Sequence, residues 1–72
     1  MKKILIHTDF IQIDQALKKE GLIQSGGEMA FFIEKKAIRI NHVLCTEKRK
    51  KVYPGDQIHF QGEDFIIARE NK

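Results

Sequence analysis

The stretch LIQSGGEMAFFIEKK, residues 22–36, marks the start of a helix and raises a question about its two glycines. Ser25 is a favoured N-cap residue, and Glu28 completes a capping box: the serine oxygen accepts the Glu28 N–H, and the carboxylate reaches back to the serine N–H. Gly26 and Gly27 then occupy the first two helical positions, although glycine is a poor helix former. Either they allow close packing of a neighbouring backbone, or they leave the free N–H groups open to one phosphate. A nucleotide-binding loop is not expected, because its Gly-Lys-Ser/Thr ending is missing.

The residues after the cap repeat with helical spacing. One face is apolar because its members recur at i, i+3 and i+4: Met29, Phe32 and Ile33. Lys35 and Lys36 are expected in the last helical turn, where cations suit the helix dipole. Phe31 lies about 160° from the centre of the apolar face, at about 100° per residue. We expect it either to pack against the first helix or the N-terminal strand, or to stay exposed for stacking on an unpaired base.

The rest of the chain predicts one more helix and several short strands. A strand over residues 3–7 ends at Thr8 and Asp9, and a short amphipathic helix then begins near Ile13 and closes at Gly21, a C-cap glycine with positive φ. After the second helix the apolar period changes to two, which is typical of strands. The expected strands and turns are strand 37–40, turn 41–42, strand 43–45, exposed loop 47–51, turn 54–56, strand 57–60, turn 61–64 and strand 65–68.

Length and composition limit the fold and the chemistry. The 72 residues, 42% hydrophobic and 32% charged, predict one folded domain over residues 1–72, an α+β unit with two short helices packed on a small, mostly antiparallel sheet. No apolar run is long enough to span a membrane, so we expect a cytoplasmic protein without a membrane partner. Cys45 is expected to be a small core or edge residue, and no redox role is claimed for it.

No catalytic or metal site is expected. The three histidines lie far apart in the sequence and have no metal-ligand spacing: His7, His42 and His59. The acidic residues form no paired arrangement suited to acid–base catalysis, and Ser25 is better explained as a helix cap than as a nucleophile. We therefore expect a protein that is not an enzyme and needs no cofactor.

The positive charge is concentrated in one region. The chain carries a formal net charge of +3, yet residues 35–51 contain seven basic residues and one acid, a local charge of +6. The rest of the chain carries −3, the difference between these two values. Clustered cations attract phosphates at one place, while the rest of the surface does not bind polyanions non-specifically. The charge pattern therefore predicts a localised face that binds a polyanion.

The order of these features resembles a known family. Over residues 11–60 the chain is similar to the RNA-binding domain named after ribosomal protein S-four, and more closely to its stand-alone bacterial members of the YaaA type. The matching elements are Leu17-Lys18, Gly21-Leu22-Ile23, Ser25-Gly26-Gly27-Glu28, Ile38-Arg39-Ile40-Asn41, Lys48 to Lys51 and Pro54-Gly55-Asp56. Three positions depart from the family pattern: Ala30 replaces a basic residue, His42 replaces the turn glycine, and Glu47-Lys48-Arg49 replaces Arg-Arg-Gly.

The resemblance implies a non-catalytic module that binds structured RNA, ribosomal or transfer RNA, in ribosome assembly or on a ribosomal particle. Recognition of structured RNA by shape and backbone contacts suits a small module without a row of exposed aromatic residues. The predicted contacts are Lys18, Lys19, Ser25, Gly26, Gly27, Lys35, Lys36, Arg39, Asn41, His42, Lys48, Arg49, Lys50 and Lys51. The alternative is a protein-interaction module that uses the basic face, or an exposed edge strand over residues 65–68.

Overall fold

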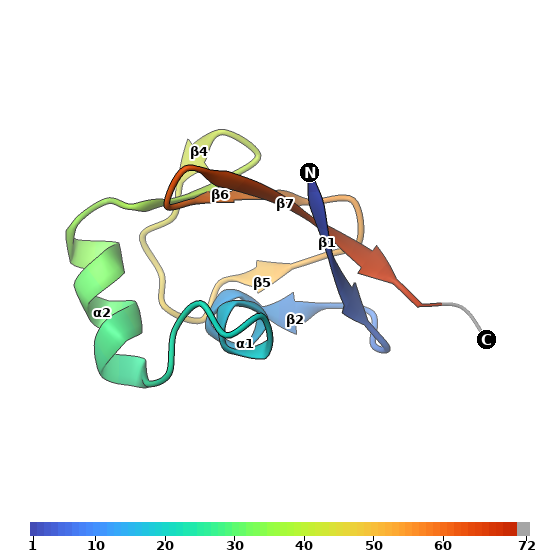
Figure 1. Cartoon of the computed structure of the whole chain (residues 1–72), viewed down its shortest axis with the longest axis horizontal. Coiled ribbons are helices and arrows are strands. Elements are labelled where there is room, and N and C mark those ends of the chain that lie inside the picture. Colours follow the sequence, from blue (N-terminus) through green and yellow to red (C-terminus); the bar gives the residue numbers. More distant parts are fainter. Residues whose placement is uncertain (71–72) are drawn as a thin grey trace.

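The chain forms two helices and two β-sheets in residues 1–70, the part that the computed structural model describes (Figure 1). The helices are α1 (Ile13–Lys19) and α2 (Gly26–Glu34). The strands are β1 (Lys2–Ile6), β2 (Ile11–Gln12), β3 (Ile38–Ile40), β4 (Val43–Leu44), β5 (Lys51–Val52), β6 (Gln57–Phe60) and β7 (Glu63–Arg69). The predicted α+β class, with two short helices on a small, mostly antiparallel sheet, is confirmed.

The larger sheet has the strand order β1-β7-β6-β3-β4, and the smaller one pairs β2 with β5. Only β1 and β7 run parallel; the other neighbours are antiparallel. In Figure 1 strands β4, β6 and β7 of the larger sheet lie above α1 and the β2–β5 pair, β1 runs down to the level of β2, and α2 lies at one end of the molecule. Within residues 1–70, no helix is long and apolar enough to cross a bilayer.

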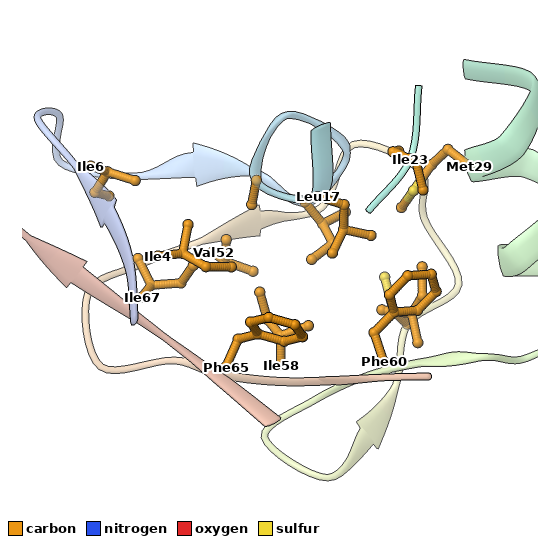
Figure 2. Packing of buried hydrophobic residues seen from close by; sticks show 14 residues of the cluster. Ile4, Ile6, Leu17, Ile23, Met29, Val52, Ile58, Phe60, Phe65 and Ile67 are labelled. Carbon is orange, nitrogen blue, oxygen red and sulfur yellow. The ribbon is translucent and has the colours of Figure 1, made fainter. Parts of the chain in front are cut away.

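The core fills the space between these layers. Side chains of β1 and β6 alternate between buried and exposed positions, and those in the middle of β7 alternate between buried and partly buried ones, as the period of two requires. Their buried members meet Leu17 of α1, Met29 of α2 and Val52 of β5 (Figure 2). Phe32 of α2 packs edge-on against Phe60 of β6, with ring centroids 4.8 Å apart. Helix α2 is thus held against the larger sheet by its predicted apolar face.

Helix α1 ends as predicted, at a glycine in the left-handed region. Gly21 has φ +73°, and its N–H donates to the Lys18 carbonyl at 2.9 Å. The Leu22 N–H donates to the Leu17 carbonyl, also at 2.9 Å, which completes a Schellman motif. This motif turns the chain toward the start of α2.

The capping box of α2 differs from the prediction in one bond. Ser25 Oγ accepts the Glu28 N–H at 3.4 Å, as expected. The Glu28 carboxylate accepts the Gln24 N–H at 2.9 Å instead of the Ser25 N–H.

The C-terminal end of α2 also differs from the prediction. Lys35 and Lys36 lie after the helix and not in its last turn, because α2 ends at Glu34. Lys35 is the C-cap residue, so any favourable effect of its charge on the dipole acts from outside the helix.

Three further predictions, about an edge strand, a loop and a turn, are wrong. The segment over residues 65–68 is not an edge strand, because β7 lies between β1 and β6 and is paired on both sides. The edges of the larger sheet are β1 and β4. Lys51 does not lie in a loop, because it is the first residue of β5. This strand pairs with β2, and neither strand was predicted from the sequence. The turn before β7 is also shorter than predicted, because β7 begins at Glu63.

Candidate nucleic-acid interface

All fourteen predicted contact residues are exposed, but the structure distributes them over several surfaces. They lie at the end of α1 (Lys18, Lys19), the start of α2 (Ser25, Gly26, Gly27), just after α2 (Lys35, Lys36), on β3 and its turn (Arg39, Asn41, His42), and at Lys48 to Lys51. The nine residues of α2 span about 13 Å at 1.5 Å per residue, so its two predicted groups lie far apart. One ligand must therefore extend along the molecule to meet them all.

The basic segment, Lys48 to Lys51, has the highest density of available charge. It follows β4 and leads into β5, and its backbone is fixed by a hydrogen bond from the Ile13 N–H to the Lys50 carbonyl at 2.7 Å. The ion pairs that form within residues 1–70 use none of its four side chains. Its cations are therefore exposed and free of carboxylate partners in the described part of the chain, on a backbone that is tied to the start of α1.

Two hollows of about 400 Å³ each adjoin this segment. The first extends from Lys50 and Lys51 to the β3–β4 hairpin, and Asn41 lines it. The second is lined by Arg49 and the same two lysines, together with Tyr53 and Glu47. The structure therefore brings Asn41 and the basic segment together.

Arg39 is not among the residues that line these hollows. It is the exposed residue of β3, where it lies opposite His59 of β6 on the face of the sheet away from the core. His59 Nδ1 contacts Asp64 Oδ1 at 2.7 Å, so an acid is also present on that face. Arg39 thus lies outside the two hollows that the basic segment lines.

Asn41 forms a joint between the hairpin and the turn over residues 54–56. Its Nδ2 donates to Asp56 Oδ1 at 3.0 Å, and its Oδ1 accepts the Gln57 N–H at 2.9 Å. The other Asp56 oxygen accepts the Tyr53 N–H at 2.8 Å. We call this set of bonds the Asn41–Asp56 joint. Each polar atom of the Asn41 side chain already forms one hydrogen bond within the protein, and its predicted contact with a ligand stays a prediction.

His42 follows Asn41 at the tip of the hairpin. The two residues have φ +52° and +70°, which is the arrangement of a type I′ turn. Such turns favour glycine at the second position, because a side chain in the left-handed region is strained. The histidine is exposed there, so its side chain is accessible for the predicted contact with RNA.

The glycines at the start of α2 are not close-packing residues. A Cβ atom added at Gly26 would meet nothing within 4 Å, and one at Gly27 would meet only Ser25 Oγ at 3.7 Å. Neither glycine has a positive φ. The close-packing interpretation of the pair is therefore wrong, and the fold itself gives no reason for glycine at these positions.

Phe31 is half exposed, at 50%. Its ring meets Phe32 edge-on, with centroids 5.3 Å apart, and Lys35 Nζ lies 5.6 Å from its centre. Both neighbours belong to α2 or its cap. The aromatic ring of Phe31 is therefore accessible on the outer surface of α2.

A second aromatic surface, formed by Phe10 and Tyr53, was not predicted from the sequence. Phe10 and Tyr53 are 37% and 49% exposed, and their ring centroids lie 5.8 Å apart. Lys51 Nζ lies 4.6 Å from the centre of the Phe10 ring. Recognising the β2–β5 pair would have revealed this surface, because the register that places Ile11 opposite Val52 also places Phe10 opposite Tyr53.

Cys45 is buried, as expected for a core residue. Burial raises the pKa of its thiol above the ordinary value, and the thiol donates to the Glu47 carbonyl at 3.3 Å. A raised pKa leaves little reactive thiolate at neutral pH. In residues 1–70, no group of three or more His, Cys, Asp or Glu side chains is placed to hold a metal ion.

These features define a class: a small α+β binding module with a cation-rich, hollowed surface beside a two-stranded sheet. The chain belongs to the S4 domain family, whose model matches residues 4–68. It is also similar to the "Probable ribosome maturation protein RlbA" of Bacillus subtilis (strain 168), at 32% identity over 59 residues. That alignment covers 82% of this chain and 83% of the relative. The family resemblance inferred from the order of motifs is confirmed.

Proposed function

We propose that this protein is a non-catalytic RNA-binding protein that binds structured ribosomal RNA, during ribosome assembly or on a ribosomal particle. Membership of the S4 domain family supports the RNA-binding part of the proposal. The similarity to a ribosome maturation protein supports the ribosomal part. A cytoplasmic location follows from this proposal, because ribosomes are assembled there in bacteria.

The observation that carries the proposal is the basic segment. Its four cations are exposed beside two hollows, and none is neutralised by an ion pair within residues 1–70. A phosphate backbone releases counterions when it meets such cations, which provides affinity without reading sequence. The remaining predicted contacts would then extend the interface along α1, α2 and the hairpin, and shape would provide selectivity.

Salt dependence tests the electrostatic part of the proposal. If about five cations meet phosphates, the logarithm of affinity should fall with the logarithm of salt concentration at a slope of about −4 to −5. The measurement is a filter-binding or anisotropy titration with purified ribosomal RNA at several salt concentrations. A slope near zero would contradict the electrostatic contribution.

A charge reversal with a matched control locates the interface. Arg49→Glu with Lys50→Glu should reduce the magnitude of the salt slope by about two, since two phosphate contacts are lost. Lys2→Glu with Lys3→Glu changes the net charge equally on β1, away from the hollows, and should leave the slope nearly unchanged. Equal effects of the two variants would show that binding follows total charge and not this surface.

The same variants decide between RNA and a protein partner that does not use the basic segment. Co-sedimentation with ribosomal particles should be lost after ribonuclease treatment if RNA is the ligand. Co-sedimentation that survives ribonuclease and ignores the Arg49→Glu, Lys50→Glu reversal would favour a protein partner and refute the proposal.

A further inference from the structure

The aromatic pair Phe10 and Tyr53 lies directly beside the basic segment. The rings are tilted by 47° at 5.8 Å, and Lys51 Nζ lies over Phe10 at 4.6 Å. Phe10 therefore has a cation on one face, whereas Tyr53 is 49% exposed and lines both hollows. Lys51 and Tyr53 flank the buried Val52 on β5, so both side chains project to the outer side of the small sheet.

We propose that Tyr53 stacks on an unpaired base of the bound RNA, while Arg49 and Lys50 contact the phosphates that flank this base. The inference rests on the proposed function and adds to it a site for one unpaired nucleotide. The second hollow, of about 400 Å³, lies between these groups, since Arg49, Lys50 and Tyr53 all line it. A cationic groove combined with an exposed aromatic ring is the usual arrangement for binding single-stranded RNA.

A further lining residue, Glu47, distinguishes a nucleotide from a simple polyanion. Glu47 is the only acid among the five residues that line the second hollow. A carboxylate repels a bare phosphate chain but accepts hydrogen bonds from the N–H groups of a base. The hollow thus offers three cations for phosphates, one acceptor for a base edge and one ring for a base face.

The fold requires little of the Tyr53 ring, because the residue lies outside the hydrophobic core. The joint uses only its backbone, through the N–H that donates to Asp56 and the carbonyl that accepts the Asp56 N–H at 2.9 Å. The joint therefore fixes the position of the residue while leaving its side chain free. This separation permits substitutions of the ring without loss of the turn.

The natural chain provides its own probe of stacking. It contains one tyrosine and no tryptophan, so its tyrosine emission comes from Tyr53 alone. Stacking on a base should quench this emission when single-stranded oligoadenylate binds. The same strand paired in a full duplex, and inorganic polyphosphate, bring the phosphates without an unpaired base and should quench much less. Quenching is compared at matched fractional saturation, with free N-acetyltyrosinamide correcting for RNA absorbance.

Two substitutions of Tyr53 test whether binding needs an aromatic ring or only a large apolar side chain. Tyr53→Leu should weaken binding of oligoadenylate by about five- to hundredfold, whereas Tyr53→Phe should stay close to the natural protein. Phe31→Leu, at the other half-exposed aromatic, tests the competing stacking position and should have less effect than Tyr53→Leu. Circular dichroism and thermal unfolding establish that each variant is folded.

The outcomes separate this inference from the proposed function. RNA binding that keeps its salt slope, with no quenching and no loss in Tyr53→Leu, overturns the stacking site and leaves the proposed function intact. A chain that binds no RNA overturns both. Equal quenching by oligoadenylate, duplex and polyphosphate overturns the stacking site as well, because base stacking would then not be its cause.

Discussion

The Asn41–Asp56 joint and the basic segment both belong to the motif that resembles the family, yet their side chains act differently. In the joint, the carboxylate and amide bind other groups of the protein at 2.8–3.0 Å. In the basic segment, no side-chain cation takes part in an ion pair within residues 1–70. The motif thus contains residues that stabilise the fold, as in the joint, and residues whose charged groups stay free to bind a ligand, as in the basic segment.

The two regions are also coupled in space. Asn41 and Asp56 line the first hollow together with Lys50 and Lys51. The turn is also hydrogen-bonded to β7 through its backbone. The Gly55 N–H donates to the Ile67 carbonyl at 2.8 Å, and the Ile67 N–H donates to the Asp56 carbonyl at 2.9 Å. The joint therefore fixes one wall of the surface on which the cations lie, and it ties that wall to an interior strand.

Removing the joint's carboxylate should have the largest effect on stability. Asp56→Ala removes the acceptor of the Tyr53 N–H and of the Asn41 amide, so we expect a loss of about 2 to 3 kcal/mol in the free energy of unfolding. Urea denaturation followed by circular dichroism measures this loss. RNA affinity per folded molecule should fall less than in the Arg49→Glu, Lys50→Glu variant.

A second aspartate supplies the control for this prediction. Asp64 contacts His59 at the exposed face of the sheet, and exposed pairs contribute less than about 1 kcal/mol. Asp64→Ala should therefore destabilise the protein much less than Asp56→Ala. Equal losses in the two variants would contradict the structural role assigned to the joint.

The features that the sequence predicted are those set by local rules. The capping serine, the apolar face of α2 and the glycine after α1 depend on neighbours within a few residues, and all three are confirmed. The exposure of every predicted contact residue follows from its polarity, or from the lack of a side chain to bury. These local signals sufficed for the class of fold and for the location of the densest positive charge.

The features that were missed depend on pairing across long sequence separations. Strands β2 and β5 have two residues each, too few to show a period, and they meet only when the whole chain folds. The parallel pairing of β1 with β7 joins the two ends of the described chain and removes the expected edge strand. The Asn41–Asp56 bond spans 15 positions, so no local pattern predicts it.

Lys36 offers a smaller test of the same comparison. It has φ +58° and completes a Schellman motif after α2, with its N–H donating to the Ile33 carbonyl at 3.0 Å. Glycine is preferred at this position, so Lys36→Gly should stabilise the protein by about 1 kcal/mol in thermal unfolding. If Lys36 belongs with the ligand-binding residues, RNA affinity should fall as stability rises.

The preceding lysine is the control for this change. Lys35 has an ordinary helical conformation, with φ −77°, so Lys35→Gly removes the same charge without relieving any strain. It should destabilise α2 by about 0.5 to 1 kcal/mol. If both variants changed stability in the same direction, the left-handed conformation of Lys36 would not be its source.

The glycine pair at the start of α2 provides the smallest and most direct test. Because a Cβ atom at Gly26 or Gly27 would meet no close neighbour, Gly26→Ala and Gly27→Ala should each stabilise the helix, by about 0.5 kcal/mol in urea unfolding. A loss of stability would restore the close-packing interpretation. If the variants are more stable but bind RNA more weakly, the two glycines are ligand-binding residues, like the basic segment. Their backbone N–H groups would then be open to a phosphate because no side chain covers them. Higher stability with unchanged binding would exclude a phosphate contact that depends on bare glycine.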